Sequence, residues 1–351
     1  MIRVLIVDDS LVAQKLLNYI YSKDSDIKVV GIASDGVEAV DLTIQNQPDV
    51  ISMDIHMPGM DGYETTRKIM ETRPTPIVLV SGTEDKNDVA GTFKIMEAGA
   101  LTAVNRPPAP DHPDFEQMCA DLRNTIKLMA EVKVVKRTPK REQPKPESGR
   151  SRFTRTFADV SLPNVRLIAI GASTGGPGII QKILTEMPKN LPVPILIVQH
   201  IANGFTQGLV DWLKNTTGFN IKVGEHGETV FPGTAYVSPD GLNMGIDTAG
   251  KKLVCVPFGP GKIISSVSYL FETVSAAYGV HAAGVLLTGM GDDGAKELKL
   301  MKDRGGLTIA QDKDSCIVFG MPAEAIKLGA ATIILPPDRI VNALISNLEM
   351  K

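Results

Sequence analysis

A serine in the second half of the chain has the surroundings of a nucleophile. The apolar run 165–170 leads into Gly171-Ala172-Ser173-Thr174-Gly175, and a helical pattern begins at Ile179. A G-x-S-x-G segment between a strand and a helix is typical of a nucleophile elbow, in which a sharp turn exposes the serine. The helix N-terminus behind Ser173 would favour developing negative charge. A phosphate-binding glycine loop and a plain tight turn stay open as alternatives, although neither the P-loop pattern nor G-x-G-x-x-G occurs.

A catalytic serine needs a base, and the base needs an acid that orients it. His200 ends the strand-like segment 194–200. In a parallel sheet it would therefore reach the same edge as Ser173. His226 and His281 lie in less regular segments, so His200 is the favoured base.

The orienting acid is expected in a second glycine-rich turn. The apolar run 284–288 leads into Gly289-Met290-Gly291-Asp292-Asp293-Gly294. Two adjacent carboxylates cannot both face one imidazole, so one of Asp292 and Asp293 would orient the base while the other is solvated. The order serine, histidine, aspartate differs from that of the α/β-hydrolases, in which the acid precedes the histidine.

Three carboxylates in the first half of the chain suggest a different chemistry. Asp8 and Asp9 close the first strand-like run, and Asp54 closes the third. The carboxyl ends of parallel strands meet at one edge of a sheet, where the three groups would repel one another unless a cation joined them. Mg²⁺ suits such oxygen ligands together with a phosphate, so phosphoryl transfer to a carboxylate is possible. Helix capping by the Asp8-Asp9 pair is the simpler alternative.

Alternating strands and helices would position all of these residues. In the first block, apolar runs at 2–7, 28–33, 50–53, 77–81 and 101–104 alternate with helical patterns at 11–22, 36–46, 62–71, 88–98 and 114–131. In the second block, apolar runs lie at 165–170, 194–198, 234–237, 284–288, 307–310 and 332–335. Both patterns predict an α/β fold with a doubly wound parallel sheet. Residues 242–247 and 252–256 flank a turn and predict a β-hairpin.

Charge divides the chain in the same way. The formal net charge of −3 separates into −8 for residues 1–130, +5 for residues 131–165 and 0 for residues 166–351. The basic segment contains Pro139, Pro144 and Pro146, which favours an extended linker over a nucleic-acid-binding helix. We expect domains at 1–130 and 165–351 and a linker at 131–164, with no nucleic acid as a partner. No signal peptide, membrane-spanning run, disulfide framework or zinc pattern is indicated, which favours a cytoplasmic protein.

The first block resembles the receiver domain of two-component response regulators. The resemblance rests on Asp8-Asp9-Ser10, on Asp54-Ile55-His56-Met57-Pro58-Gly59-Met60-Asp61-Gly62 and on Ser81. It implies phosphorylation of Asp54, Mg²⁺ held by Asp8, Asp9, Asp54 and the Ile55 carbonyl, and Ser81 as the switch hydroxyl.

Two positions depart from the receiver pattern. Arg106 stands where the usual residue is lysine, and Ala103 stands at the aromatic switch position. Arginine keeps the charge but is not an isostere of lysine. Ala103 has no ring to rotate, so coupling from Ser81 to a rotating ring cannot operate in its usual form.

The second block resembles the catalytic domain of chemotaxis protein-glutamate methylesterases. The matching strings are Gly171–Pro177, Gln199-His200, Thr288–Gly294 and Phe319-Gly320-Met321-Pro322. The resemblance implies a triad of Ser173, His200 and Asp293, which resolves the choice between the two aspartates. It also implies an oxyanion hole formed by the backbone amides of Thr174 and Met290, and no cofactor for the esterase.

Together the two resemblances imply a phosphorylation-regulated serine hydrolase. Its substrates would be γ-glutamyl methyl esters on chemoreceptors, with glutamine deamidation as a second activity. A histidine kinase of the chemotaxis pathway would be the phosphodonor, and membrane contact would come only through the receptors. The alternatives are an esterase of the same fold acting on a non-receptor ester, a non-catalytic adaptor, and a transcription regulator, which the neutral second block disfavours.

Overall fold

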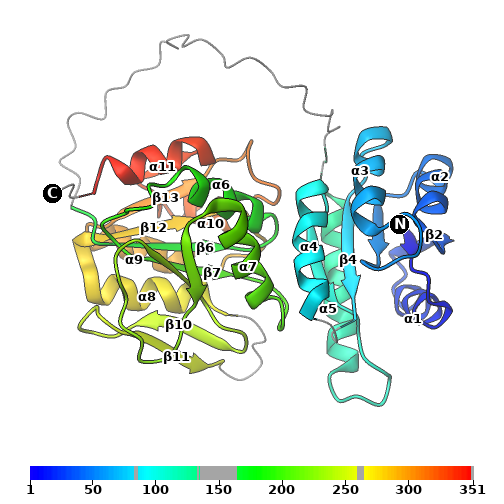
Figure 1. Cartoon of the computed structure of the whole chain (residues 1–351), viewed down its shortest axis with the longest axis horizontal. Helices are drawn as coiled ribbons and strands as arrows, with labels where there is room; N and C mark the ends of the chain where they lie inside the picture. Colours follow the sequence, from blue (N-terminus) through cyan, green and yellow to red (C-terminus); the bar gives the residue numbers. More distant parts are fainter. Residues whose placement is uncertain (83–85, 133, 135–163, 259–264, 349–351) are drawn as a thin grey trace, which may run out of the picture.

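The structure is a computed structural model that describes residues 1–82, 86–132, 134, 164–258 and 265–348. It contains two α/β domains, each built on a parallel sheet (Figure 1). This confirms the predicted fold class. Most of the predicted linker at 131–164 lies outside the described residues, so the two boundaries between linker and domains stay predictions.

The N-terminal domain contains a five-stranded sheet in the order β2-β1-β3-β4-β5, with every described pair parallel. The apolar runs form its central strands, which are buried on both faces, as expected for a sheet covered by helices on two sides. Side chains of Ser10, Asp35 and Asp61 cap the first three helices. The strands are β1 (Ile2–Val7), β2 (Ile27–Ala33), β3 (Val50–Met53), β4 (Ile77–Ser81) and β5 (Thr102–Asn105). The helices are α1 (Leu11–Ser22), α2 (Gly36–Asn46), α3 (Gly62–Thr72), α4 (Lys86–Ala98) and α5 (Phe115–Ala130).

The C-terminal domain contains a seven-stranded parallel sheet in the order β14-β13-β12-β6-β7-β9-β8. The strands are β6 (Leu167–Ala172), β7 (Ile195–Gln199), β8 (Asn220–Val223), β9 (Thr234–Val237), β12 (Ala282–Leu286), β13 (Leu307–Gln311) and β14 (Ile333–Leu335). The helices are α6 (Gly176–Glu186), α7 (Thr206–Thr217), α8 (Val267–Tyr278), α9 (Ala295–Asp303), α10 (Met321–Lys327) and α11 (Pro337–Ile345), with a short 3₁₀ turn at Gly279–His281. The predicted hairpin is present as β10 (Leu242–Ile246) and β11 (Leu253–Pro257), which form a separate antiparallel pair.

The edge strand β8 has no counterpart among the predicted strands. Its sequence is Asn-Ile-Lys-Val, and only Ile221 is fully buried. A short edge strand has one side without a partner strand and needs no continuous apolar run. The periodicity of the sequence therefore gave no signal for it.

The two domains pack against each other through α4 of the N-terminal domain, which contacts α7 and α6 (Figure 1). Phe93 is fully buried and belongs to a hydrophobic cluster that otherwise consists of C-terminal-domain residues. Its ring stacks on Trp212, with centroids 5.4 Å apart. On the rim of this contact, a carboxylate oxygen of Glu97 accepts hydrogen bonds from Gln181 Nε2 at 2.9 Å and from Trp212 Nε1 at 3.2 Å.

Candidate active site and phosphorylation pocket

Ser173 lies in the turn between β6 and α6, at the carboxyl edge of the seven-stranded sheet. Its backbone N–H donates to the Thr288 carbonyl at 3.0 Å, and its carbonyl accepts the Gly176 N–H at 2.8 Å. Gly175 has a φ of 79°, and a Cβ there would come within 2.7 Å of Ile317. Glycine is therefore required both by the backbone conformation and by the close approach of the neighbouring loop. The local structure is the sharp strand–turn–helix that the sequence pattern predicts.

His200 and Asp293 are hydrogen-bonded, with 2.8 Å between His200 Nε2 and a carboxylate oxygen of Asp293. The carboxylate also lies on the N-terminus of α8, where it accepts the N–H groups of Val267 at 2.7 Å and Ser268 at 3.0 Å and the hydroxyl of Ser266 at 3.2 Å. Burial alone would raise the pKa of Asp293, but the hydrogen bonds from His200 and Ser268 outweigh it and hold the pKa below its ordinary value. Asp293 is therefore ionised at neutral pH and can stabilise a protonated imidazole.

The orientation of the His200 ring decides which nitrogen can act as base. Because Nε2 faces Asp293, Nδ1 is the nitrogen available to a proton from Ser173. The two other candidate bases are engaged elsewhere: the His226 ring contacts the Cys255 backbone, and His281 Nδ1 contacts the Asn164 carbonyl. Ser173 and His200 line the same small cavity. Within the described residues the Ser173 hydroxyl makes no hydrogen bond, so the structure brings Ser173 and His200 to one cavity without joining them by a hydrogen bond.

Gln199 holds the serine and the histidine together, a role that the sequence did not indicate. Its Nε2 donates to the carbonyl of Ser173 and to the carbonyl of His200, both at 2.8 Å. The side chain is almost fully buried. One amide group thus fixes the separation of the two backbone segments that carry the candidate nucleophile and base.

Two backbone amides beside Ser173 are available to an oxyanion. In the part of the chain that the structure describes, neither the Thr174 nor the Met290 N–H has an acceptor. The two residues come from adjacent turns, after β6 and after β12, and these strands pair directly. Two amides without a partner, on adjacent turns near the candidate nucleophile, would suit stabilisation of a tetrahedral intermediate.

The N-terminal domain covers this site. Phe93, Met96 and Ala103 face Ser173 and His200 across a cavity of about 20 Å³. That volume holds about one water molecule and no ester substrate. In this arrangement the candidate active site is therefore closed.

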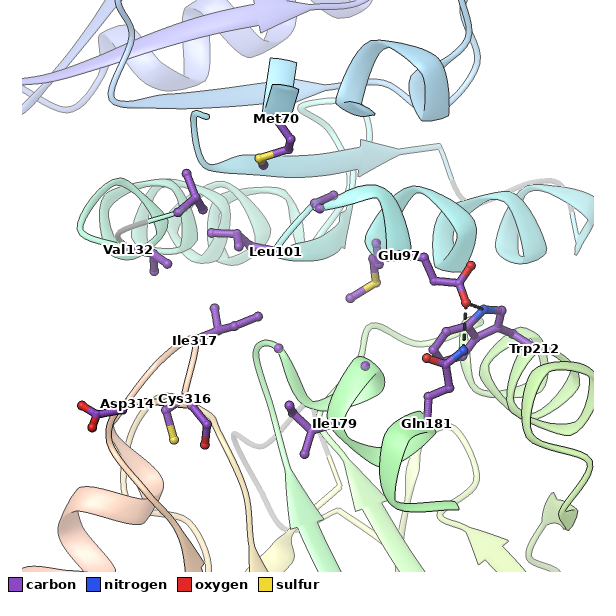
Figure 2. Close-up of a pocket in the computed structure, with 17 residues that line it drawn as sticks. Met70, Glu97, Leu101, Val132, Ile179, Gln181, Trp212, Asp314, Cys316 and Ile317 are labelled. Atoms are coloured by element: carbon purple, nitrogen blue, oxygen red, sulfur yellow. Dashed lines mark hydrogen bonds between the residues drawn. The ribbon is translucent and has the colours of Figure 1, made fainter. Parts of the chain in front are cut away.

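A second cavity, of about 550 Å³, lies beside the first in the same domain interface (Figure 2). Leu101 and Val132 line it from the N-terminal domain, and Ile179 and Ile317 line it from the C-terminal domain. Glu97, with its hydrogen bonds to Gln181 and Trp212, stands at one end. The domain interface is thus incompletely packed close to the serine, which is compatible with docking that can be reversed.

The acidic residues of the N-terminal domain converge as predicted from their positions at strand ends. Ligand oxygens of Asp8, Asp9 and Asp54 lie within 4.8 Å of one another. Arg106 reaches into this cluster, where one of its nitrogens lies 3.0 Å from Asp8 and 3.0 Å from Asp54. Burial and the neighbouring Asp8 charge raise the pKa of Asp54 to about 6, although Arg106 opposes this. A divalent cation would relieve the repulsion, so the donor set fits Mg²⁺.

The remaining predicted pocket residues lie around this cluster. Ser81 is buried at the end of β4, and its carbonyl accepts the Arg106 N–H at 2.7 Å. The backbone of Ile55 hydrogen-bonds to Asp54. The Ile55 carbonyl lies close to Gly62, where a Cβ would be 3.0 Å away. Of the four predicted Mg²⁺ ligands, the three carboxylates are the ones whose oxygens the structure brings within 4.8 Å of one another.

Comparison with known proteins assigns both halves of the chain. A model of the CheB methylesterase family matches residues 168–344, and a model of the response regulator receiver domain matches residues 4–113. A protein-glutamate methylesterase/protein-glutamine glutaminase of Syntrophus aciditrophicus is 46% identical over 351 residues, covering 98% of this chain and 98% of that protein. The chain belongs to the CheB methylesterase family. A second member, from Geobacter metallireducens, is also 46% identical and covers 99% of both chains.

A solved structure supports the assignment of the esterase domain. The Thermotoga maritima CheB methylesterase catalytic domain is 36% identical to this family member, with a TM-score of 0.50, and the match covers 52% of this chain and 98% of that one. We refer below to the N-terminal unit as the receiver domain and to the C-terminal unit as the esterase domain. Among the described helices none is both long and apolar enough to cross a bilayer.

Proposed function

We propose that this protein hydrolyses γ-glutamyl methyl esters on chemoreceptors, with Ser173 as nucleophile, His200 as base and Asp293 as orienting acid. The observation that carries the proposal is the hydrogen bond of 2.8 Å between His200 Nε2 and Asp293, beside a serine that shares its cavity with His200. The names of relatives with 46% identity over nearly the full chain support this substrate class.

The proposed reaction uses these groups in turn. His200 Nδ1 accepts the proton of Ser173 as the serine oxygen attacks the ester carbonyl carbon. The oxygen of the tetrahedral intermediate becomes negative and accepts the N–H groups of Thr174 and Met290. The intermediate collapses, the C–O bond to the methoxy group breaks, and the imidazolium returns its proton so that methanol leaves. Water, deprotonated by the same nitrogen, then attacks the acyl-serine and releases a glutamate carboxylate and free Ser173.

Deamidation of receptor glutamines uses the same steps with ammonia as the leaving group. The relatives are named for both activities. The anchoring of Asp293 on α8 supports both, because an ionised acid stabilises the imidazolium that must protonate either leaving group.

Phosphorylation of Asp54 is proposed to open the closed arrangement. Mg²⁺ would be held by Asp8, Asp9, Asp54 and the Ile55 carbonyl. The switch residues, whose side chains would move toward the phosphoryl group, would be Ser81 and Arg106. The bound cation would supply charge neutralisation for phosphoryl transfer. Phosphorylation would favour the undocked population of the receiver domain. The proposed phosphodonor is a histidine kinase of the chemotaxis pathway. The proposed location is the cytoplasm, where the protein would meet the cytoplasmic helices of the receptors. No nucleic acid is proposed as a partner.

The test is methanol release from membranes that carry methylated receptors, with and without a phosphodonor. We expect release to rise with the phosphodonor, to lose that rise in Asp54→Ala, and to disappear in Ser173→Ala. Deleting residues 1–150 should raise the basal rate. Labelling of Ser173 by a serine-reactive probe, with loss of labelling in His200→Ala, tests the chemistry separately from the substrate. Labelling without methanol release would point to a non-receptor ester, and the absence of both would favour a non-catalytic adaptor.

A further inference from the structure

Thr288 occupies a junction between three turns at the carboxyl edge of the esterase sheet. It follows β12 and has no solvent exposure. Its backbone N–H donates to the Gln311 side-chain oxygen at 2.8 Å, and its carbonyl accepts the Ser173 N–H at 3.0 Å. Its hydroxyl accepts the Val318 N–H at 2.9 Å, and its one proton is shared between the Thr174 carbonyl at 3.0 Å and the Val318 carbonyl at 3.2 Å. One buried residue thus joins the serine turn, its own turn and the segment around Val318.

These hydrogen bonds surround the first amide of the candidate oxyanion hole. The Thr174 N–H belongs to the peptide between residues 173 and 174. Thr288 holds the polar groups on either side of that peptide, namely the Ser173 N–H through its carbonyl and the Thr174 carbonyl through its hydroxyl. Because a peptide is planar, the direction of the Thr174 N–H is set by the Ser173 carbonyl of the same peptide, which accepts the Gly176 N–H and the Gln199 side chain, both at 2.8 Å. Thr288 limits rotation of this peptide by holding the groups on the two peptides that flank it.

The second amide is held by the same junction. The Met290 N–H shares a peptide with the Gly289 carbonyl, which accepts the N–H groups of Gly320 at 3.0 Å and Met321 at 2.9 Å. The Gly289 N–H in turn donates to the Val318 carbonyl at 3.0 Å. The Val318 N–H is the one that donates to the Thr288 hydroxyl. The hydroxyl therefore connects the backbone segments that carry the two oxyanion amides.

We propose that Thr288 is a positioning residue that sets the spacing of the Thr174 and Met290 amides in the transition state. The inference rests on the proposed function, because it needs an oxyanion at this position. The Thr288 side chain touches no reacting atom. Its removal should weaken stabilisation of the charged intermediate and leave ground-state substrate binding and the His200–Asp293 pair intact.

The central experiment compares Thr288→Val, which removes only the hydroxyl in a nearly isosteric side chain, with Thr288→Ser, which retains it. In the full chain with a phosphodonor, we expect Thr288→Val to lower kcat about 10- to 100-fold. This is less than the loss of about 100- to 1,000-fold for a removed oxyanion donor, because the amides are displaced and not removed. KM should stay within about twofold, as expected when only the transition state loses an interaction. The pH profile should keep its shape, and Thr288→Ser should recover most of the rate.

Thr308→Val is the matched control. Thr308 is also fully buried in the esterase sheet, and its hydroxyl lies 2.7 Å from the Ala330 carbonyl and accepts the Thr332 N–H at 2.9 Å. It lies near the start of β13, at the opposite edge from Ser173. We expect this variant to lose thermal stability as Thr288→Val does while kcat is unchanged.

The rate at which a fluorophosphonate labels Ser173 provides a readout that is independent of the receptor substrate. Thr288→Val should label at least about tenfold more slowly, since the phosphonyl oxygen uses the same amides. A wild type that labels but releases no methanol refutes the proposed substrate and leaves the Thr288 comparison valid. Folded Thr288→Val with wild-type kcat and labelling would overturn the inference. So would an equal loss in Thr308→Val, or failure of both Thr288→Val and Thr288→Ala to fold when Thr308→Val folds.

Discussion

Phe93→Ala should release the esterase from its closed arrangement without phosphorylation. Phe93 comes from α4 of the receiver domain, but it is buried in the hydrophobic cluster of the esterase domain and stacks on Trp212. In an undocked receiver this ring would lose that environment. The substitution therefore acts mainly on docking and spares the receiver core, whose two clusters do not include Phe93.

The size of the effect follows from what the ring loses. Burying a phenylalanine side chain contributes about 1.5–3 kcal/mol, and an aromatic pair adds about 0.5–1.5 kcal/mol. A total of about 2–4.5 kcal/mol changes the ratio of docked to undocked molecules roughly 30- to 1,600-fold. The rate cannot exceed that of the fully undocked enzyme, so we expect basal activity to approach the phosphodonor-stimulated rate of the wild type.

The assay is methanol release from methylated receptor membranes without a phosphodonor. Lys94→Ala is the matched control, because Lys94 is the next residue of the same helix and is exposed. It should behave as the wild type does. A folded Phe93→Ala protein whose basal rate equals that of Lys94→Ala, and which still needs the phosphodonor, would refute the argument that docking of α4 closes the site.

Three further changes test the electrostatics and the rim of the interface. Trp212→Phe removes the donor to Glu97 and should raise basal methanol release about fivefold, as for the loss of one hydrogen bond of about 1 kcal/mol; an unchanged rate would contradict this. The pKa of Asp293 is lower in the folded protein than the ordinary aspartate pKa of about 3.9. The ionised carboxylate therefore stabilises the fold at pH values above about 3.9, and this stabilisation is lost as the pH falls toward the pKa of the folded state. The difference in melting temperature between wild type and Asp293→Asn should therefore be largest near neutral pH and should shrink below about pH 4. Without Mg²⁺, the Asp54 carboxyl followed by NMR should titrate at about 6, and Arg106→Ala should move the midpoint upward because an attractive charge is lost.

The sequence predicted the parts of this protein that depend on local patterns. Apolar runs that end in Asp8, Asp54, Ser173 or His200 placed these residues at sheet edges, and the structure brings them together in two sites. Local patterns could not choose between adjacent Asp292 and Asp293, and that choice came from the resemblance to a family. In the structure the physical reason is the N-terminus of α8, which receives the Asp293 carboxylate.

Contacts between distant segments left no signal of that kind. The Thr288 hydroxyl bridges residues that are 114 and 30 positions away in the chain. Contacts at such separations leave no periodic pattern of apolar residues in the sequence. Docking of α4 was equally hidden, because a buried Phe93 on an amphipathic helix looks the same whether it packs on its own sheet or on another domain. Only the fold determines which surface covers such a residue.

The alanine at the aromatic switch position has a physical explanation in the interface. Ala103 lies on β5 in the wall of the 20 Å³ cavity over Ser173, and a ring there would have no room. Two residues further along the chain, the Asn105 side chain donates to the Asn203 carbonyl at 3.2 Å, in the loop that follows His200. The next residue is Arg106, which pairs with Asp8 and Asp54. The strand β5 and the residue that follows it therefore connect the proposed phosphorylation pocket directly to the candidate active site. If phosphorylation of Asp54 drew Arg106 away from Asp8, the change would act on this strand end, and weakening the contact would need no rotating ring.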